Sequence, residues 1–463
     1  MAEDIGEECG IMAVFGGPEV TRRVVMGLYS LQHRGQESVG VATANGEDIH
    51  VIKRMGLVTE LNKDEKEIAS MTGLASIGHV RYSTTGHSTL NNAQPMLVST
   101  KRGQLSVAHN GNITNAAEIR KEMEEAGHIF QTTSDSEVLL HQVARSQQPQ
   151  LIDALSDCLK ELSGAFCMVF LTRNEVYVAR DPFGFRPLCL GRLDRAWVIA
   201  SETCALDLLG ASYVRDIKPG ELCRIDEDGL ESRFFAERPR RAHCIFEFIY
   251  FSRPDSRIFE ESCDKVRRKI GKMLAKEHPV EADVVVSVPD SSNTAALGYA
   301  TESGIPFDIG LLRNHYVGRT FIDPSQNVRE QKVKLKFNTI GGVLRGKRVV
   351  LVDDSIVRGT TLKILCKMIR EAGASEVHIR ISSPPVISPC FYGMDFPSKT
   401  ELIAGNLTIE ETRKLLGADS LQYLSIEGMK TVPPGGGENY CSACFDADYP
   451  DPIPENNAKF RCG

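Results

Sequence analysis

An aliphatic run that ends in two adjacent carboxylates, at residues 349–354, constrains the fold of this chain more than any other segment. Its apolar part, 349–352, is typical of a strand buried on both faces, and residues 362–371 after it have the pattern of a helix. The turn between them carries a Ser, an Arg, a Gly and two Thr. A strand, an acidic pair, a turn of hydroxyls and glycine, and a helix together predict a βα unit that binds phosphate.

The polar residues of this unit fall into two groups of ligands. Backbone N–H groups and hydroxyls at the start of a helix can hold a phosphate, and Asp353 and Asp354 would face ribose hydroxyls or a hydrated Mg²⁺. A plain βα turn capped by Ser355 is the alternative, but it gives the two carboxylates no role. The turn has no Gly-Lys-Ser/Thr of a Walker A loop and is not a Gly-x-Gly-x-x-Gly loop. The phosphate ligands that we predict are Ser355, Arg358, Gly359, Thr360 and Thr361.

The chain as a whole has the composition of an ordinary globular protein. Its 463 residues are enough for two domains with sizeable cores, and 42% of them are hydrophobic. A net charge of −7 gives no sign of a nucleic-acid partner, and no apolar run approaches the ~20 residues that span a bilayer. Residues 1–8 are acidic and lack the apolar centre of a signal peptide, so we expect a cytoplasmic protein without a membrane partner.

Two patterns of secondary structure divide the chain. Between residues 10 and 235, short apolar strands and amphipathic helices alternate with few βαβ repeats, which predicts a layered α+β domain. From about residue 244 onward, apolar strands of the parallel type alternate with helices, which predicts a doubly wound α/β sheet with ligands beyond the carboxyl ends of its strands. The segment 231–243, rich in Arg and Glu, is expected to connect the two. The tail 432–463, rich in Pro, Gly and Asn, is expected to wrap the surface.

Cys9 and four polar clusters stand out in the first half. Cys9 lies at the head of a predicted strand, and the clusters follow predicted strands or helices or open a helix. Each feature alone has an ordinary explanation: Cys9 as a core cysteine, Asn110-Gly111 as a hairpin turn, and Ser134 or Asp135 as a helix N-cap. Taken together, polar groups gathered at the ends of strands and helices are what a binding pocket requires. The clusters are residues 33–38, 78–84, 109–113 and 133–137.

These clusters, together with Cys9, resemble the glutaminase domain of the class II glutamine amidotransferases, which are N-terminal-nucleophile hydrolases. The resemblance covers roughly residues 9–235. It implies that Cys9 is the nucleophile and that its own α-amino group, with a pKa of ~8, is the base. Because Cys9 must then be the first residue of the mature chain, residues 1–8 are expected to be a propeptide that is removed.

The resemblance also implies roles for the polar clusters, position by position. Arg81 would pair with the α-carboxylate of glutamine, and Asp135 would bind its α-ammonium group. The side chain of Asn110 and the backbone N–H of Gly111 would form the oxyanion hole. The residues expected to line the rest of the pocket are Arg34, Gly35 and Thr84.

The second half resembles the type I phosphoribosyltransferases. The segment 349–361 resembles the loop of that family that binds phosphoribosylpyrophosphate (PRPP). Residues 288–293 resemble its pyrophosphate loop, which implies that Ser291 contacts pyrophosphate or its Mg²⁺. The polar, basic stretch 313–336 is either a solvated loop or a mobile lid that excludes water from PRPP. Its basic residues include Arg329, Lys332, Lys334 and Lys336.

Both halves together resemble the glutamine PRPP amidotransferase family. The fold expected on this basis is an α+β N-terminal-nucleophile hydrolase sandwich at 9–240, followed by an α/β type I phosphoribosyltransferase domain at 241–463. The resemblance implies the first committed step of de novo purine biosynthesis, in which PRPP, glutamine and water give 5-phosphoribosylamine, glutamate and pyrophosphate. It also implies passage of ammonia through an internal channel, a homotetramer, and feedback inhibition by purine nucleotides.

The cysteines suggest one further site. Thirteen cysteines in a long chain without a signal peptide do not predict a disulfide framework, and most are expected to be buried small hydrophobic residues. Cys244, Cys390, Cys441 and Cys444 together supply four thiolates, enough for structural zinc or a [4Fe–4S] cluster. Ligand chemistry does not choose between them. The resemblance implies the cluster, because one branch of the family carries a [4Fe–4S] cluster at these positions together with a propeptide; Cys462 is expected to be a bystander.

Two other functions compete with this interpretation. A glutaminase could serve another acceptor, as in glucosamine-6-phosphate synthase or asparagine synthetase, but those enzymes have no PRPP loop like 349–361. A phosphoribosyltransferase fold can also serve as a PRPP sensor in a transcriptional regulator, but Cys9 and the lack of a basic DNA-binding module argue against that function.

Overall fold

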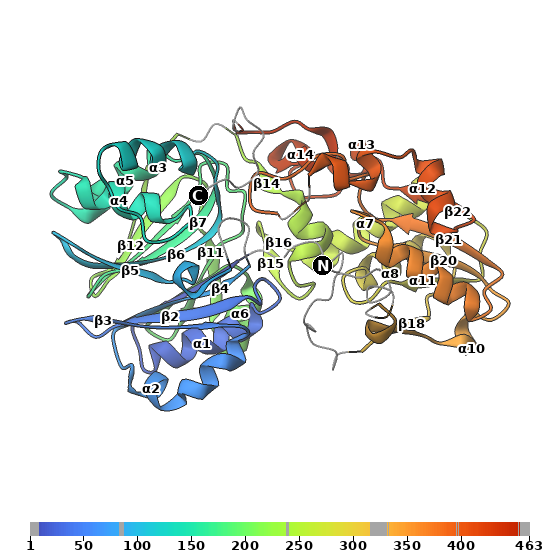
Figure 1. Cartoon of the computed structure of the whole chain (residues 1–463). Helices are drawn as coiled ribbons and strands as arrows, with labels where there is room; N and C mark the ends of the chain where they lie inside the picture. Colours follow the sequence, from blue (N-terminus) through green and yellow to red (C-terminus); the bar gives the residue numbers. More distant parts are fainter. Residues whose placement is uncertain are drawn as a thin grey trace.

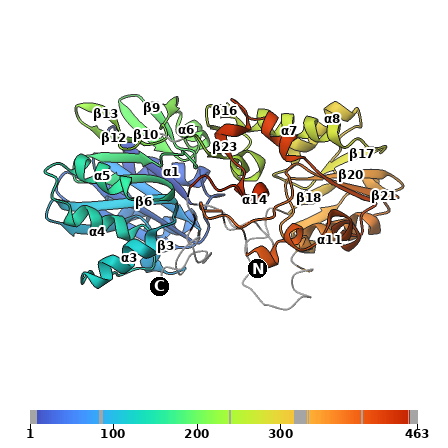
Figure 2. The ribbon, with the colours of Figure 1, turned by 90° about the horizontal axis from the view of Figure 1, so that it is seen from above.

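The computed structural model describes residues 9–451 except 83–87, 238–239, 315–330, 332, 395 and 397, and it also describes residue 453. The chain forms two lobes that lie side by side (Figures 1 and 2), the first from the N-terminal half and the second from the C-terminal half. Within the described part of the chain, no helix is both long and apolar enough to cross a membrane.

The first lobe is built on two antiparallel sheets. The larger has the strand order β11 (Ser212–Asp216), β9 (Cys189–Leu193), β10 (Ala196–Ala200), β1 (Gly10–Phe15), β4 (Ala75–Arg81), β2 (Ser38–Ala44) and β3 (Ile49–Met55). The smaller has the order β13 (Gly229–Phe234), β12 (Glu221–Asp226), β8 (Val176–Arg180), β7 (Gly164–Leu171), β6 (Gly103–Ile113) and β5 (Met96–Thr100). Because β1 pairs with both β10 and β4, the strand that follows Cys9 lies at the centre of its sheet.

The two sheets face each other, and helices cover their outer faces (Figure 1). Small and branched side chains such as Ile11 and Ala108 fill the layer between the sheets. On the outer side, Val24 and Leu28 lie one helical turn apart and pack into the core of the larger sheet. This arrangement confirms the predicted N-terminal-nucleophile hydrolase sandwich. The helices are α1 (Val20–Ser30), α2 (Glu65–Ser70) and α6 (Thr203–Leu209) on the larger sheet, and α3 (Ala116–Glu125), α4 (Glu137–Arg145) and α5 (Leu151–Lys160) on the smaller.

The second lobe is built on a parallel sheet with the strand order β17 (Val284–Ser287), β20 (Arg348–Asp353), β21 (Glu376–Ile381) and β22 (Ser420–Tyr423). Successive residues of β20 face opposite sides of the sheet. Val350 packs with α7 (Cys263–Glu277) and α8 (Asn293–Ser303), whereas Leu351 packs with α11 (Thr360–Glu371) and α12 (Ile409–Leu416). Helices on both faces of a parallel sheet confirm the predicted α/β phosphoribosyltransferase fold.

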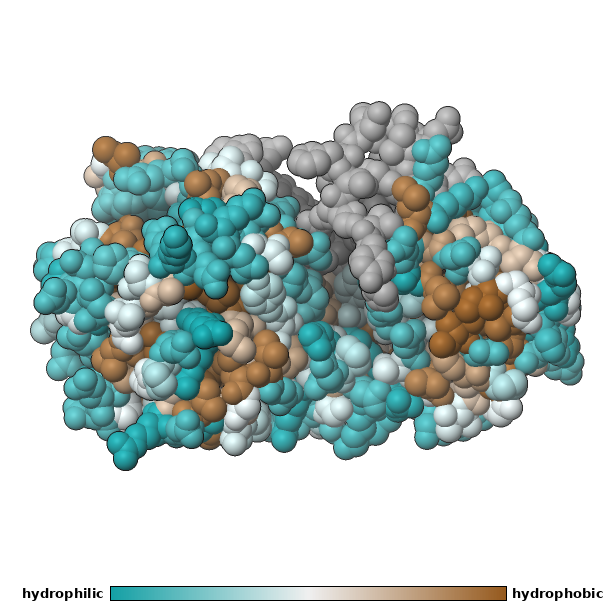
Figure 3. Space-filling model, turned by 90° about the horizontal axis from the view of Figure 1, so that it is seen from below, coloured by the Kyte–Doolittle hydropathy of each residue, from teal (hydrophilic) through white to brown (hydrophobic). Residues whose placement is uncertain are grey.

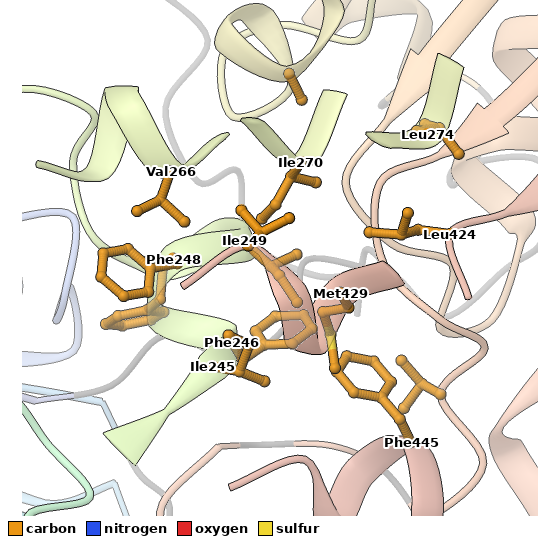
Figure 4. Packing of buried hydrophobic residues seen from close by; sticks show 14 of the residues in the cluster. Ile245, Phe246, Phe248, Ile249, Val266, Ile270, Leu274, Leu424, Met429 and Phe445 are labelled. Carbon is orange, nitrogen blue, oxygen red and sulfur yellow. The ribbon is translucent and has the colours of Figure 1, made fainter. Parts of the chain in front are cut away.

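Part of the C-terminal segment belongs to the core of the second lobe. Figure 4 shows Phe445 and Met429 close to Phe246, in a cluster that also includes residues of α7. The expectation that 432–463 wraps the surface is therefore wrong for residues 440–445, whose aromatic side chains are at most 8% exposed. A short parallel pair between β14 (His243–Cys244) and β23 (Tyr440–Cys441) fixes this segment to the connection between the lobes.

A cluster of buried charges joins the two lobes. The Arg34 guanidinium donates through Nε to Glu202 Oε1 at 2.5 Å and through Nη2 to Glu247 Oε2 at 2.6 Å. Glu247 begins a π-helical turn of the second lobe, Glu247–Phe251, and its Oε1 lies 3.5 Å from Nη1 of Arg186. All four side chains are fully buried. Burial alone would raise the pKa of both glutamates, but Arg34 outweighs it and lowers the pKa, so both stay ionised.

Replacing Glu247 by Ala would leave Arg34 and Arg186 buried without one of their counter-charges. Breaking a buried ion pair in this way costs about 3–5 kcal/mol, so Glu247→Ala should clearly lower the midpoint of urea or thermal unfolding. The matched control is Glu124→Ala, which removes an exposed i,i+4 pair with Arg120 and should leave the midpoint almost unchanged. Equal midpoints for the two variants would contradict the role of Glu247 at the interface.

Candidate active sites and cysteine site

Cys9, Arg81 and Asn110 lie at one end of the layer between the two sheets of the first lobe. Ile11 and Ala108 fill this layer, and they lie two positions from Cys9 and Asn110 respectively. Because alternate residues of a strand face the same side, Cys9 and Asn110 lie on the same sides of their strands as Ile11 and Ala108, toward the layer between the sheets. Arg81 ends β4, the strand that pairs with β1.

The thiol of Cys9 is buried in this layer. Its Sγ lies 3.5 Å from the carbonyl oxygen of Tyr82, and the residue is 8% exposed. Burial raises the pKa of the Cys9 thiol to about 11, and the nearby charge of Asp135 adds to this, while the Tyr82 contact and the charge of Arg81 act in the opposite direction. The thiol is therefore neutral at neutral pH and needs a base before it can act as a nucleophile.

Asn110 and Gly111 lie within β6 and do not form a hairpin turn. Gly111 has φ +143°, and a Cβ at this position would collide with the carbonyl oxygen of Ala165, so only glycine fits. The Asn110 amide is 1% exposed, and neither its Oδ1 nor its Nδ2 has a hydrogen-bond partner among the described residues. A buried amide without partners is costly, which marks it as a group that awaits a ligand.

Asp135 does not cap a helix. α4 begins at Glu137 with Ser136 as its N-cap residue, and no side chain caps it, so the expectation of Ser134 or Asp135 as the cap is wrong. Instead, Asp135 Oδ2 accepts a hydrogen bond of 2.9 Å from the backbone N–H of Ile113, near Gly111. Burial alone would raise the pKa of Asp135, but His109 and this hydrogen bond outweigh it and lower the pKa. A buried, ionised carboxylate suits a cationic ligand group.

The residues predicted to line the rest of the glutamine pocket differ in their surroundings. Gly35 packs against the backbone of Arg81, where an added Cβ would stand 2.6 Å from Arg81 N. Arg34 binds Glu202 and Glu247, so its guanidinium serves the interface between the lobes in this structure. Thr84 lies outside the described residues.

In the second lobe, two loops meet at the carboxyl edge of the parallel sheet. β17 and β20 run side by side, and the loops that follow them carry Ser291 and Ser292 on one side and Asp353 and Asp354 on the other. Ser292 Oγ donates to Asp353 Oδ1 at 3.0 Å, and Ser291 Oγ donates to Asp354 Oδ2. Burial raises the pKa of both carboxyls, and that of Asp353 is raised further by Asp354. Ser292, which the sequence analysis did not select, is the residue that contacts both carboxylates.

The predicted phosphate turn leads directly into α11. Gly359 takes the left-handed conformation, φ +79°, at the N-cap position, and Thr360 and Thr361 open the first helical turn. Ser355 Oγ donates to Asp354 Oδ1 at 2.7 Å. Arg358 forms an ion pair with Glu401, with 3.0 Å between Nη2 and Oε1. Of the stretch 313–336, Arg329 and Lys332 lie outside the described residues.

The four predicted ligand cysteines meet around one cavity. The pairing of β14 with β23 sets Cys244 beside Cys441, and Cys444 follows in α14 (Ala443–Asp446). With Cys390 they line one small cavity. Burial, and then the other three sulfurs, raise the pKa of the Cys444 thiol well above its usual value. Among the described residues, no three His, Cys, Asp or Glu side chains converge tightly enough to hold a single metal ion.

The other cysteines that we expected to be buried in apolar surroundings are buried, which confirms that expectation. They are Cys158, Cys167, Cys189, Cys204, Cys223 and Cys366. Cys462 lies outside the described residues, as do residues 1–8.

Family models and relatives agree with this arrangement of two sites. Residues 79–208 match the model described as a glutamine amidotransferase domain, and residues 256–382 match a phosphoribosyl transferase domain. The amidophosphoribosyltransferase of Bacillus subtilis is 48% identical over 97% of this chain and 95% of its own length. That of Mycobacterium tuberculosis is 48% identical over 98% of this chain and 88% of its own length.

Solved structures agree over the whole chain as well. The glutamine PRPP amidotransferase of B. subtilis complexed with ADP and GMP has a TM-score of 0.92 at 46% identity, covering 97% of this chain and 99% of that one. A structure described as the allosteric regulatory enzyme of purine biosynthesis has a TM-score of 0.93 at 46% identity, covering 97% and 98%.

The fold and the two sites thus define a glutamine amidotransferase fused to a phosphoribosyltransferase. At this identity and coverage, the chain belongs to the amidophosphoribosyltransferase family. It is a transferase of the first step of purine biosynthesis, which makes 5-phosphoribosylamine from PRPP and glutamine.

The high pKa of Cys9 has a consequence that can be measured on the chain that retains residues 1–8. With a pKa of about 11, the thiolate fraction at pH 7 is on the order of 10⁻⁴, because each pH unit below the pKa lowers it about tenfold. Alkylation of Cys9 by iodoacetamide, followed by peptide mass spectrometry, should therefore be slow at pH 7 and accelerate steeply up to pH 10. Cys366, whose pKa burial raises to about 12, is the internal control and should react more slowly still. Rapid, pH-independent alkylation of Cys9 would contradict this environment.

Proposed function

We propose that the first lobe releases ammonia from glutamine at Cys9 and that the second lobe uses this ammonia to displace pyrophosphate from PRPP beside Asp353 and Asp354. The observation that carries the proposal is the buried amide of Asn110, which has no hydrogen-bond partner among the described residues and lies on the strand of Ala108, while Cys9 precedes the strand of Ile11 that faces it across the layer. A folded chain tolerates such an orphaned group where a ligand or transition state supplies its partner.

At the glutaminase site, the sulfur of Cys9 attacks the side-chain amide carbon of glutamine. The α-amino group of Cys9, freed by removal of residues 1–8, takes the thiol proton and passes it to the departing nitrogen, which leaves as ammonia. Nδ2 of Asn110 and the N–H of Gly111 stabilise the negative oxygen that forms. Water then cleaves the thioester to glutamate and regenerates the thiol. Arg81 and Asp135 hold the α-carboxylate and the α-ammonium group of the substrate.

At the phosphoribosyl site, the chain presents two carboxylates whose pKa is raised by burial, and the neighbouring charge of Asp354 raises that of Asp353 further. This donor set fits Mg²⁺, a hard cation that prefers carboxylate and hydroxyl oxygens, so we assign Asp353, Asp354 and Ser291 to it. Mg²⁺ would neutralise the pyrophosphate of PRPP. The N–H groups at the start of α11 suit the phosphate of PRPP. The other groups assigned to PRPP are those of Ser355, Arg358, Gly359, Thr360 and Thr361.

The cysteine site supplies four thiolates, which are suitable ligands for a [4Fe–4S] cluster or for structural zinc. Cys244, Cys390, Cys441 and Cys444 line one small cavity, which brings their sulfurs together. We assign the cluster, which the resemblance to the iron–sulfur branch of the family favours. A cluster there would tie β14, the loop of Cys390 and the C-terminal segment together.

The same proposal includes a homotetramer that purine nucleotides inhibit. Support for inhibition comes from the B. subtilis relative, which is complexed with ADP and GMP. Support for assembly comes from apolar surface: Figure 3 shows apolar residues gathered in patches between hydrophilic ones, and side chains such as Ile309 and Leu312 are about half exposed. Association would cover such surface. Ammonia would pass between the sites inside the chain, where it cannot escape as ammonium.

Variants in the two lobes should separate the two half-reactions. Asn110→Ala should lower kcat for glutamine-dependent synthesis by about 10²–10³, and Cys9→Ala should abolish it, because one removes an oxyanion donor and the other the nucleophile. Both should keep synthesis from added ammonia. Asp354→Asn should lose synthesis from either nitrogen source but keep glutamine hydrolysis without PRPP. The measurements are phosphoribosylamine formation with each nitrogen source and glutamate release.

Stability serves as the control for these variants. Because the Asn110 amide has no hydrogen-bond partner among the described residues, Asn110→Ala should not lower the unfolding midpoint. Equal loss of both activities in Cys9→Ala, or full glutamine-dependent activity in Asn110→Ala, would refute the assignment.

The four thiols should act as one unit. Replacing Cys244, Cys390, Cys441 or Cys444 by Ser should lower the soluble yield, the iron and sulfide content and the absorption near ~400 nm that thiolate-bound iron produces. Cys366→Ser is the matched control, because this buried cysteine lies in a core away from the cavity and should change none of these properties. A colourless protein with one zinc per chain after anaerobic purification would show that zinc occupies the site.

A further inference from the structure

The loop 390–393 joins the cysteine cavity to the strand that carries Asn110 and Gly111. It begins with Cys390, one of the four cysteines around the cavity. The next residue, Phe391, accepts a hydrogen bond of 2.8 Å on its carbonyl oxygen from Nδ2 of Asn112. Asn112 follows Gly111 directly, is 6% exposed, and lies 279 positions away from Phe391 in the sequence. This buried bond therefore links the second lobe to the immediate neighbour of the predicted oxyanion donors.

Gly393 brings the same loop against the backbone of Gly111. Its φ is +111°, and a Cβ at this position would stand 3.5 Å from the carbonyl carbon of Gly111 and 2.9 Å from Nη2 of Arg186. Glycine here permits the left-handed conformation and leaves room for the Arg186 guanidinium, while the loop lies in contact distance of the Gly111 backbone. The loop thus contacts the segment 110–112 at two points.

The loop is also fixed from its other side. Arg186 donates to the carbonyl oxygen of Tyr392 through Nε at 3.1 Å and through Nη2 at 2.5 Å. The backbone N–H of Tyr392 donates to Cys390 Sγ at 3.3 Å, and the Tyr392 ring stacks on Phe185 with 4.3 Å between the ring centroids. Two of the side chains that contact Tyr392, those of Arg186 and Phe185, are fully buried. The loop is therefore a rigid support and not a loose surface segment.

We propose that Asn112 is a positioning residue of the glutaminase site. By binding the loop 390–393, it fixes the position of the neighbouring oxyanion donors, Asn110 and Gly111. The inference rests on the proposed oxyanion role of those two residues. Donors must stand within hydrogen-bond distance of the developing oxyanion, and a misplacement of about 1 Å costs on the order of 100-fold in rate.

The test is Asn112→Ala in the full chain. We expect kcat for glutamine-dependent synthesis to fall about 10- to 100-fold, with little change in KM for glutamine, because Arg81 and Asp135 still bind the substrate. Synthesis from added ammonia should stay as in the wild type. The matched control is Asn115→Ala, which removes a half-buried amide that forms no hydrogen bond with the loop 390–393 within the described part of the chain. This amide donates to the carbonyl oxygen of Glu161 at 2.8 Å and accepts from the backbone N–H of Ser163 at 3.0 Å, and its loss should change neither activity.

Gly393→Ala is a second variant that disturbs the same support through a different contact. It should show the same split between the two nitrogen sources. The double variant should lose little more than the larger single loss, because both changes release one segment. A readout that does not depend on activity is amide hydrogen exchange in the peptide that covers residues 109–113, which should speed up in both variants and not in Asn115→Ala.

The outcomes separate this inference from the proposed function. Asn112→Ala and Gly393→Ala with glutamine-dependent kcat within twofold of the wild type would overturn the inference, as would equal losses with glutamine and with ammonia. If either of these results is found while Asn110→Ala still loses glutamine-dependent activity, the oxyanion assignment of Asn110 stands and only the positioning role of Asn112 fails. If Asn110→Ala is fully active with glutamine, both fail.

Discussion

Two arginines and two glutamates, buried at the junction of the lobes, hold the first lobe against the second. Taking ions out of water costs several kcal/mol each, so Arg34 and Glu247 can be buried only when each finds its partner. Arg34 comes from the first lobe and Glu247 from the second, so one arrangement of the lobes satisfies both. Gly35, next to Arg34, lies against the backbone of Arg81. Adjacent residues of one backbone segment therefore serve the interface and the predicted glutamine pocket. A shift of one lobe against the other would displace the backbone of this pocket.

Two pairs of carboxylates differ in the groups that surround them. Glu202 and Glu247 have Arg34 beside them, and their pKa is lowered. Among the described residues, Asp353 and Asp354 accept hydrogen bonds from hydroxyl and N–H groups, and their pKa is raised. The first pair is neutralised by an arginine of the protein and stabilises the junction of the lobes. The second pair has no cation in hydrogen-bond contact within the described part of the chain, which is the electrostatic reason to look for a metal or substrate there.

Much of the fold could be predicted from local sequence, and the reasons for the failures are physical. Gly10–Phe15 and Ala196–Ala200 are examples of the short apolar strands predicted between residues 10 and 235, because short apolar runs specify such strands locally. The predicted cap at Ser134 or Asp135 failed because a tertiary hydrogen bond from Ile113 takes the Asp135 carboxylate. The segment 440–445 is buried despite its loop-like composition, because its pairing with β14 depends on residues about two hundred positions earlier. The ion pair of Arg34 could not be predicted from local sequence either. The motif around Arg34 predicts a residue of the glutamine pocket, whereas its counter-charge Glu247 lies more than two hundred positions later, in the other lobe.

The link between Asn112 and Phe391 also bears on the order in which the two activities arise. A chain made from its N-terminus can form both sheets of the first lobe before the loop 390–393 exists, since none of their strands comes from the second half. Until that loop arrives, the segment 110–112 is paired with β7 but lacks the hydrogen bond from Asn112 to Phe391 and the contact with Gly393. Glutamine hydrolysis then becomes efficient only after the second lobe, which consumes the ammonia, has folded against the first. The fusion of two domains in one chain does not by itself make glutamine hydrolysis wait for the second lobe. The order follows because the loop 390–393 of the second lobe supports the glutaminase site of the first.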